Sequence, residues 1–379
     1  MTQPDHRNTL RSKLLNLALI VGSIGVGYAM TNLLFLTLIR SSGQAKGLPR
    51  SLVSHLPAPL RWGYPDLGAK GNSNDIALIG DSYVEGAGDD YRNNIKNYSI
   101  GHHLRQKLRE PLATFGTNGT SLGTSIQLYD SSLNGKLWPM SDPRPHNEKP
   151  ERILAFFYEG NDLDNQIEEQ ETGGASKHIQ ALESNRRFQP LRLFLNTKLR
   201  ARTNQPRQTG TSYNDQPNQA NTVCGKSYCK SLRPMQAASP SLSQAELKQA
   251  IEATSKALEH LKEKSKGKIC LVYIPSPATI YSPKKVRFQQ DKLPNRPTTG
   301  SVTGKSNAAR SHFIRTTLQA QSERLGIPMI DSTPALQTAA QTEFLHGIND
   351  QKHFNTRGNQ VLATAVIREI NRCFPAKLK

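Results

Sequence analysis

The chain has 379 residues, and its 49 lysine and arginine residues outnumber 30 aspartate and glutamate residues, which gives a formal net charge of +19 at pH 7. A surplus of this size favours polyanionic partners, of which nucleic acid is the first to consider. The sequence contains no recognised nucleic-acid-binding module, however, which argues against that partner. Solubility of a folded domain is the alternative explanation of the charge. The length is ample for one domain of roughly 220 ordered residues together with terminal and inserted segments.

The first 39 residues have the layout of a membrane anchor. Residues 1–13 are polar and basic, whereas residues 14–39 carry no formal charge, and about 20 apolar residues suffice to cross a bilayer. A cleaved signal peptide is the rival interpretation, but the apolar region is long and no clear small-x-small site follows it. We expect a cytoplasmic tail at 1–13, a transmembrane helix at 14–39 and a proline-rich linker at 40–73. The remaining domain is expected outside the cell membrane, in the periplasm or at the cell surface, because long downstream domains translocate largely regardless of charge.

An apolar run, Ile76–Ile79, stops abruptly at Gly80-Asp81-Ser82 and is predicted to be a short buried strand. Open α/β sheets place their chemistry at the carboxyl ends of such strands. A serine in that place can expose its hydroxyl and offer its own amide to an oxyanion, and Gly80 allows close approach of the backbone. Taken alone, Gly-Asp-Ser is equally a common turn at the end of a strand.

Two further predicted strands end near groups that can donate hydrogen bonds. The run Leu112–Phe115 is followed by a stretch in which Gly119 and Gly123 compete as amide donors. The run Arg152–Tyr158 is rich in β-forming residues and ends shortly before Asn161. Backbone amides and an Asn side chain are the donors that stabilise a tetrahedral oxyanion, so these positions are candidates for that role.

Two adjacent histidines, His102 and His103, lie in a predicted amphipathic helix over residues 100–112. Neighbouring residues point to different parts of a helix surface, and no second Cys/His cluster has the spacing of a metal site. We therefore expect two exposed histidines, no metal ion and no cofactor.

Residues 166–240 are predicted to be a basic, low-complexity insert, because charged residues are interleaved there with Gln, Asn, Thr and Pro. Such a segment buries little apolar surface, which favours a long loop or a flap. Cys224 and Cys229 lie close together within it, and in an extracytoplasmic loop a local disulfide is the best interpretation. Cys270 lies in an apolar run and is predicted to be a buried free thiol, whereas Cys373 could be free or bonded.

Regular structure is predicted again after the insert. Residues 243–246 form the sequence pattern of a capping box, and a helix with one apolar face follows. Apolar runs at 269–274 and 327–331 are separated by a predicted helix around 308–325. This repeated alternation of strand and helix is typical of a parallel sheet.

Asp350 and His353 precede the last predicted helix. Apolar residues between 361 and 370 have helical spacing, and Asn355 or Thr356 can cap the helix. A histidine on the loop before a rigid helix can reach across a cleft as a general base. Asp350 could accept a hydrogen bond from its ring, as the third member of a triad does. An ordinary helix-capping loop is the alternative interpretation.

Taken together, these motifs resemble those of the SGNH (GDSL-type) hydrolase superfamily. The shared features are Gly-Asp-Ser after a strand, a glycine in a later turn, an Asn-Asp pair after another strand, and Asp-x-x-His before the final helix. Four motifs in this order are far more specific than any one of them, and the resemblance covers roughly residues 74–375 apart from the insert. The corresponding residues are Ser82, Gly123 or Gly119, Asn161, Asp350 and His353.

The resemblance implies an α/β fold, a flavodoxin-like α/β/α three-layer domain with a parallel sheet. It implies that Ser82 is the nucleophile, that His353 is the base and that Asp350 orients the base. The Ser82 amide, the Gly123 amide and the Asn161 side chain would form the oxyanion hole.

Two positions depart from the family pattern. Tyr83 stands where the family name has leucine, a common replacement. Glu159 takes the first place of the family's Gly-x-Asn-Asp block, so the turn before Asn161 is expected to differ in shape.

The resemblance implies acyl transfer from an ester either to water or to another hydroxyl, because esterases and acyltransferases of this type share their catalytic residues. The anchored layout and the Tyr-Ile-Pro-Ser-Pro stretch that ends at Pro277 look like envelope polysaccharide acetyltransferases of the superfamily. We therefore expect an O-acetyl carbohydrate as substrate, with anionic polysaccharide or lipid headgroups as partners of the basic chain.

Two other classes of function stay open at this point. One is a non-catalytic SGNH-like module that binds polysaccharide or scaffolds an envelope complex, and covalent labelling of Ser82 would discriminate it from an enzyme. The other is a cationic binder of nucleic acid or membranes, whose binding would depend strongly on salt and would survive Ser82→Ala.

Overall fold

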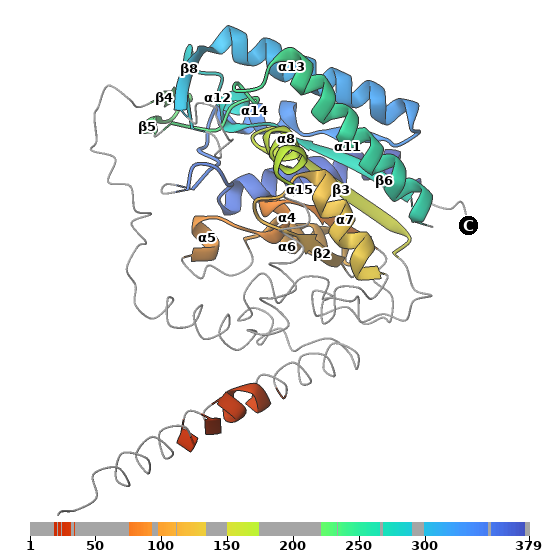
Figure 1. Ribbon diagram of the computed structural model, residues 1–379. Helices are drawn as coiled ribbons and strands as arrows, with labels where there is room; N and C mark the ends of the chain where they lie inside the picture. The colour runs from red at the N-terminus through yellow and green to blue at the C-terminus, as the bar shows by residue number, and fades with distance from the viewer. Residues whose placement is uncertain are drawn as a thin grey trace, which may run out of the picture.

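The computed structural model describes residues 76–92, 98–110, 112–133, 150–173, 221–232, 234–265, 268–289, 299–347 and 350–375, and part of 19–34. These residues form an α/β fold with a central parallel sheet and helices on both of its faces, as predicted (Figure 1). The predicted tail and linker, at 1–13 and 40–73, lie outside the described residues, as does most of the predicted transmembrane segment. Within the described part of the chain, no helix combines the length and the apolar character needed to span a bilayer.

The central sheet has five strands, and every neighbouring pair is parallel. Its strands are β1 (Ile76–Gly80), β2 (Leu112–Gly116), β3 (Arg152–Tyr158), β6 (Lys268–Ile274) and β9 (Met329–Asp331). They lie in the order β2-β1-β3-β6-β9, which corresponds to the order 2-1-3-4-5 of flavodoxin-like sheets. In this order the direction of winding reverses between β1 and β3, and ligands bind in the crevice outside the carboxyl ends of strands at such a switch point.

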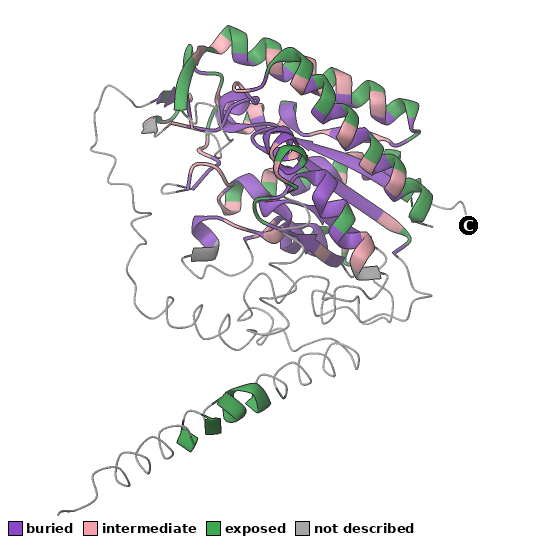
Figure 2. Ribbon diagram, viewed as in Figure 1, coloured by how far each residue is buried: buried purple, intermediate pink, exposed green. Residues whose placement is uncertain are grey.

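Side chains on the two sides of each strand build two separate cores. Ala77 and Ile79 of β1 face one core, whereas Ile76 and Leu78 face the other. The whole strand is buried because helices cover both faces, which is why it reads as a continuous apolar run. Figure 2 shows the buried strands between helices whose outer sides are exposed.

The helices fall into two layers. The first core is closed by α7 (Leu122–Leu133), α8 (Asp162–Thr172), α11 (Gln244–Lys264) and α13 (Gly304–Arg324). The second core is closed by α6 (Ile100–Leu108), α14 (Thr333–Ala340) and α15 (Thr356–Cys373).

Two predicted helix starts are confirmed, and one predicted end is wrong. The capping box at 243–246 starts α11, and Asn355 caps α15 by accepting the Gly358 N–H. The helix predicted over 100–112 ends at Leu108, because Arg109 adopts the left-handed conformation with φ of 57° and β2 begins three residues later, at Leu112. Apolar spacing alone did not mark this end, since Leu112 continues the interval of four but belongs to the strand.

The predicted insert is ordered at both of its ends. Its first residues, through Thr172, belong to α8, where Ile167 is buried in the first core. Residues 174–220 lie outside the described part of the chain. The later residues begin with an antiparallel hairpin of β4 (Asn221–Cys224) and β5 (Cys229–Leu232). The interpretation of 166–240 as one loop that buries little is therefore wrong at its ends, because the apolar residues there have a core to pack against.

The hairpin of β4 and β5 docks on a second hairpin, made by β7 (Lys285–Gln289) and β8 (Thr299–Thr303). The Asn221 side chain bonds both backbone groups of Arg287, the N–H at 2.7 Å and the C=O at 2.8 Å. A disulfide joins Cys224 to Cys229 across the first hairpin, at the positions that the sequence analysis paired.

The prediction of a free thiol at Cys270 is wrong. A disulfide joins Cys270 in β6 to Cys373 at the end of α15, across a sequence separation of 103 residues. Both residues are buried in the second core. Burial in an apolar strand is therefore no guide to the oxidation state of Cys270, because its partner is supplied by the packing of a distant helix.

Candidate active site

Strand β1 is followed by a short helix whose first residue, Ser82, lies at the carboxyl end of the strand. Asp81 caps this helix, α4 (Ser82–Glu85), by accepting the Tyr83 N–H at 3.0 Å. The neighbouring strand makes room for the turn at Gly116, where a Cβ atom would lie 2.0 Å from the Glu85 nitrogen. Ser82 therefore stands at the carboxyl end of β1, beside the switch point of the sheet.

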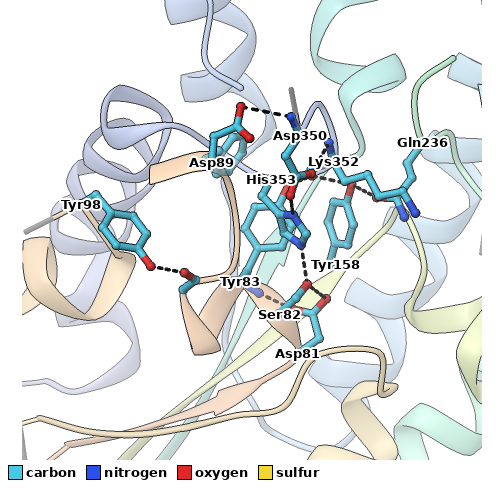
Figure 3. Close-up of polar contacts among 12 residues, drawn as sticks. Asp81, Ser82, Tyr83, Asp89, Tyr98, Tyr158, Gln236, Asp350, Lys352 and His353 are labelled. Atoms are coloured by element: carbon cyan, nitrogen blue, oxygen red, sulfur yellow. Dashed lines mark hydrogen bonds and ion pairs between the residues drawn. The ribbon is translucent and has the colours of Figure 1, made fainter. Parts of the chain in front are cut away.

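Ser82, His353 and Asp350 form a chain of hydrogen bonds (Figure 3). The Ser82 Oγ lies 2.9 Å from His353 Nε2, and His353 Nδ1 lies 2.9 Å from Asp350 Oδ2. The His353 and Asp350 side chains are only 12 % and 5 % exposed, so water screens their interaction weakly. The fold thus brings together the three residues proposed as nucleophile, base and orienting acid, although Ser82 and His353 are 271 residues apart.

A second acceptor competes for the Ser82 proton. The Ser82 Oγ is also 3.1 Å from Oδ2 of Asp81, a fully buried residue. A hydroxyl carries one proton, so Ser82 can donate to Asp81 or to His353 but not to both. Burial raises the pKa of the Asp81 carboxyl to about 6, against the opposing effects of the Tyr83 N–H and the charge of His353. Asp81 is therefore a competing acceptor, at a longer distance than the 2.9 Å between Ser82 Oγ and His353 Nε2.

The three predicted oxyanion donors come from three elements at the same edge of the sheet. Ser82 is the first residue of α4, Gly123 is the second residue of α7, and Asn161 is the N-cap of α8. The first amides of a helix have no acceptor within the helix, which suits the Gly123 N–H to an anion, whereas the Ser82 N–H already interacts with the Asp81 carboxyl. Gly119 lies instead in an exposed turn with φ of +76°, which favours Gly123 of the two competing glycines.

Asp162 ties together two elements that carry these donors. Its Oδ2 accepts the N–H of Tyr158 at 2.8 Å, and its carboxyl also bonds the N–H of Leu122 at the start of α7. Burial, and then the negative charge of Asp81, raises the pKa of Asp162 well above its ordinary value. The acid of the Asn-Asp pair thereby fixes the end of β3 to the turn of helix that contains Gly123.

Glu159, the position that departs from Gly-x-Asn-Asp, is fully buried. Its carboxyl accepts hydrogen bonds from the hydroxyls of Tyr273, Ser276, Thr279 and Ser311. These donors belong to β6, to the start of α12 (Pro277–Tyr281) and to α13. Burial raises the pKa of Glu159, and the hydroxyl donors oppose that shift. The turn before Asn161 is thus tied to three neighbouring elements by a side chain that glycine could not supply.

A second buried histidine, His346, lies close to the base but carries no charge. Burial lowers its pKa to about 3, with His353 as a further cause. The Tyr281 hydroxyl accepts the Leu345 N–H at 2.9 Å, so its own proton is directed to His346 Nδ1 at 2.8 Å. His346 therefore packs beside the site as a neutral ring and adds no positive charge near His353.

The prediction that His102 and His103 are exposed is wrong, since each is only 7 % exposed. The backbone at Thr356 and Tyr98 lies beside the His103 ring, and His102 Nδ1 lies 3.3 Å from a guanidinium nitrogen of Arg105. Burial lowers the pKa of His103. Because α6 packs against both the sheet and the neighbouring helix α15, it has two packed sides, which a simple amphipathic pattern does not reveal. In the chain segments with described coordinates, no group of three or more His, Cys, Asp or Glu could hold a metal ion.

Three residues that contact the loop around His353 carry no recognisable signal in the sequence. Tyr83 occupies the leucine position of the family name, where an apolar ring also fits. Asp89 and Asp90 follow a glycine and look like part of a turn. Their closeness to Ser82 along the chain is the one feature that could have drawn attention to them.

No protein-family model matches the chain, and no curated protein matches it. Among the solved structures that resemble it, two show how weak the similarity is. An alpha/beta hydrolase enzyme from the metagenome of Lake Arreo, Spain, is 13% identical with a TM-score of 0.36, and the match covers 79% of this chain and 97% of that one. A gut microbial diltiazem-metabolizing enzyme is 11% identical with a TM-score of 0.35, and the match covers 80% and 48%. Similarity at this level carries no argument about activity.

Proposed function

We propose that the chain is a serine esterase or O-acyltransferase of the SGNH type. The observation that carries the proposal is the chain of hydrogen bonds from Ser82 through His353 to Asp350 at the carboxyl edge of a parallel sheet. The flavodoxin-like strand order supports it, because Ser82 follows β1 and Asn161 follows β3, on the two sides of the switch point.

In the first half-reaction, Ser82 Oγ attacks the carbonyl carbon of an ester while its proton passes to His353 Nε2. Asp350 holds the ring with its proton on Nδ1 and stabilises the imidazolium that forms. The oxyanion accepts hydrogen bonds from the Ser82 amide, the Gly123 amide and the Asn161 side chain, and loss of one such donor typically costs about 3 kcal/mol. His353 then protonates the leaving alcohol, its C–O bond to the carbonyl breaks, and Ser82 keeps the acyl group.

In the second half-reaction, a water molecule or an acceptor hydroxyl attacks the acyl-Ser82 carbonyl. His353 takes the proton of the attacking group and returns a proton to Ser82 Oγ as the ester bond to the enzyme breaks. Esterase and acyltransferase chemistry therefore use the same residues. They differ in whether water or a bound hydroxyl reaches the acyl group.

We propose an O-acetyl group of an envelope carbohydrate as the substrate and an N-terminal membrane anchor as the means of retention. The uncharged segment 14–39 supports the anchor. Two disulfides support an oxidising compartment outside the cytoplasm. The net charge of +19 supports an anionic polysaccharide or lipid headgroups as partners.

The full-length protein in detergent tests the proposal by reaction with a fluorophosphonate and measurement of its intact mass. The wild type is expected to gain one adduct, Ser82→Ala none, and His353→Ala far less in the same time. Ser301→Ala is the matched control, because Ser301 is exposed on β8, and it is expected to react like the wild type.

The absence of an adduct on folded wild-type protein would contradict the enzyme and favour the polysaccharide-binding module. If the adduct forms, p-nitrophenyl acetate with and without carbohydrate acceptors separates the two activities. An acyltransferase is expected to give acetylated carbohydrate, whereas an esterase is expected to release acetate at a rate that the acceptor does not change.

A further inference from the structure

The loop that carries the base, residues 350–356, lies against the segment that carries the nucleophile, residues 82–90 (Figure 3). We call them the base loop and the nucleophile segment. The internal bonds that the backbone N–H groups of the base loop make are long, with the Lys352 N–H at 3.3 Å from Asp350 Oδ1 and the His353 N–H at 3.4 Å from the Asp350 carbonyl. Its other side pairs with residues 345–347. On the side that faces Ser82, its position is set by what joins it to the nucleophile segment.

The first contact holds the start of the base loop. Asp89 Oδ2 accepts the N–H of Asp350 at 3.1 Å, and Asp89 is only 8 % exposed. A hydrogen bond to an ionised acceptor is about twice as strong as one between neutral groups. Asp89 thus holds the backbone of the residue whose own carboxylate orients His353.

The second contact holds the end of the base loop. Asp90 Oδ2 accepts both the N–H of Thr356, at 2.5 Å, and its hydroxyl, at 2.6 Å. Thr356 is the first residue of α15, and a negative charge is favourable at a helix N-terminus. Because α15 is packed in the second core and bonded to β6 through Cys373, Asp90 links the nucleophile segment to a rigid support.

The third contact holds the middle of the base loop. The Tyr83 hydroxyl donates to the carbonyl of Lys352 at 2.6 Å, immediately before the base. The Tyr83 ring packs edge-on against Phe354, with 5.0 Å between centroids, immediately after the base. Gly88 completes the fit, because a Cβ atom there would lie 3.2 Å from His353 Cβ.

We propose that Tyr83, Asp89 and Asp90 are positioning residues that set the distance between Ser82 Oγ and His353 Nε2 by holding the base loop at its middle, start and end. This inference rests on the proposed function, since the distance matters only if Ser82 is activated by His353. It means that a single stretch of chain both supplies the nucleophile and aligns its base.

The kinetic test uses the full-length protein and hydrolysis of p-nitrophenyl acetate. Misplacement of reacting groups by about 1 Å can cost roughly 10²-fold in rate, so Asp89→Ala and Asp90→Ala are expected to lower kcat by about 10- to 100-fold. KM is expected to stay within about twofold, because these residues do not touch the substrate. Tyr83→Phe keeps the ring but loses the hydroxyl, and a fall in kcat of about 10-fold is expected.

Conservative variants and a matched control separate positioning from general stability. Asp89→Asn and Asp90→Asn keep an acceptor oxygen and are expected to recover most of the lost kcat. Asp331→Ala removes a carboxylate that accepts the Thr333 N–H at 2.9 Å at the start of a different helix, α14. It is expected to lower the melting temperature as Asp90→Ala does, yet to leave kcat within about twofold of the wild type.

The positioning role is overturned if Asp89→Ala and Asp90→Ala keep the wild-type kcat, or if Asp331→Ala loses as much activity as they do. If the wild type neither reacts with the fluorophosphonate nor hydrolyses the ester, the proposed function is wrong. Amide hydrogen exchange then tests whether Asp89 and Asp90 hold the base loop. The amides of Asp350 and Thr356 are then expected to exchange at least about tenfold faster in the matching Ala variants. Unchanged exchange would overturn the inference independently of activity.

Discussion

Ser82 and His353, the proposed nucleophile and the proposed base, are held in different ways. Ser82 follows a buried strand that is paired on both sides, and the backbone of β1, β2 and α4 fixes its place. His353 lies on a loop outside the sheet, where backbone bonds to residues 345–347 hold one side of the loop and side chains of the nucleophile segment hold the other. Backbone support survives most single substitutions, whereas each side-chain support can be removed alone. The base is therefore the part of the site that single substitutions displace most easily.

The largest expected effect tests whether Ser82 and His353 act in the same catalytic step. Ser82→Ala and His353→Ala are each expected to lower kcat for ester hydrolysis by about 10⁴-fold or more, because neither residue is effective without the other. For the same reason the double variant is expected to be no slower than the single variants. Steady-state kinetics on the three folded variants provides the measurement, and multiplied losses in the double variant would contradict a shared mechanism.

The next effect concerns the buried carboxyl of Asp81, the residue immediately before Ser82. Burial raises the pKa of the Asp81 carboxyl from 3.8 to about 6, so the folded protein holds this proton over a pH range in which the unfolded chain has lost it. Stability from this group is therefore lost as the pH rises from about 4 to about 6. Asp81→Asn removes the penalty and is expected to raise the free energy of unfolding by about 3 kcal/mol above that range and by far less below it.

Denaturant unfolding of the wild type and Asp81→Asn across this pH range measures the difference. Asn keeps an oxygen for the Tyr83 N–H, which Asp81 accepts at 3.0 Å, so the helix cap is retained. An advantage that has the same size at about pH 4 and about pH 7 would mean that Asp81 does not titrate in this window.

A smaller effect tests the close approach between Gly88 and His353. Gly88 has φ of +139°, and a Cβ atom there would lie 3.2 Å from His353 Cβ. Gly88→Ala is expected to lower kcat by about 10-fold, because the new methyl group pushes on the base, and to cost about 1–3 kcal/mol of stability through backbone strain.

Gly173→Ala is the control for that strain. Gly173 ends α8 with φ of +65° and has no heavy atom within 4 Å of its would-be Cβ. It is expected to lose similar stability and to keep kcat within about twofold of the wild type. Equal losses of activity in the two variants would assign the effect to strain rather than to contact with His353.

The smallest expected effect compares two tyrosines that approach the same carbonyl. The Tyr158 hydroxyl lies 2.6 Å from Gln236 Oε1 but 3.3 Å from the Lys352 carbonyl, so its single proton goes to Gln236. Tyr158→Phe is expected to cost about 1 kcal/mol in the free energy of unfolding and to change kcat by less than about threefold. If kinetics show a larger loss than in Tyr83→Phe, the support of the base loop comes from β3 rather than from the nucleophile segment.

The sheet and the central residues of the site could be predicted because their signals are local. A strand covered on both faces is apolar throughout, so the apolar run before Ser82 predicts a buried strand. Ser82 and His353 each stand at the boundary of a regular element, where a few neighbouring residues state the motif.

The remaining features could not be predicted because they depend on partners from distant segments. The apolar sequence around Cys270 does not distinguish a free thiol from a disulfide. Its partner, Cys373, comes close only when α15 packs against the sheet. His103 is buried because α6 packs against α15, whose first residue, Thr356, is more than two hundred positions away in the sequence. The role proposed for Asp90 likewise depends on its hydrogen bond with Thr356, a residue of a distant segment.

The disulfide between Cys270 and Cys373 bears on the proposed active site as well as on the stability of the fold. It spans 103 residues, and in the chain-entropy account a cross-link over a loop of this size stabilises the folded state by about 4–5 kcal/mol. It secures one end of α15, while the other end carries Thr356 and the loop of the base. Before these thiols are oxidised, packing alone keeps that helix on the sheet. Reduction of this disulfide is therefore expected to loosen α15 and, through Thr356, the loop that carries His353.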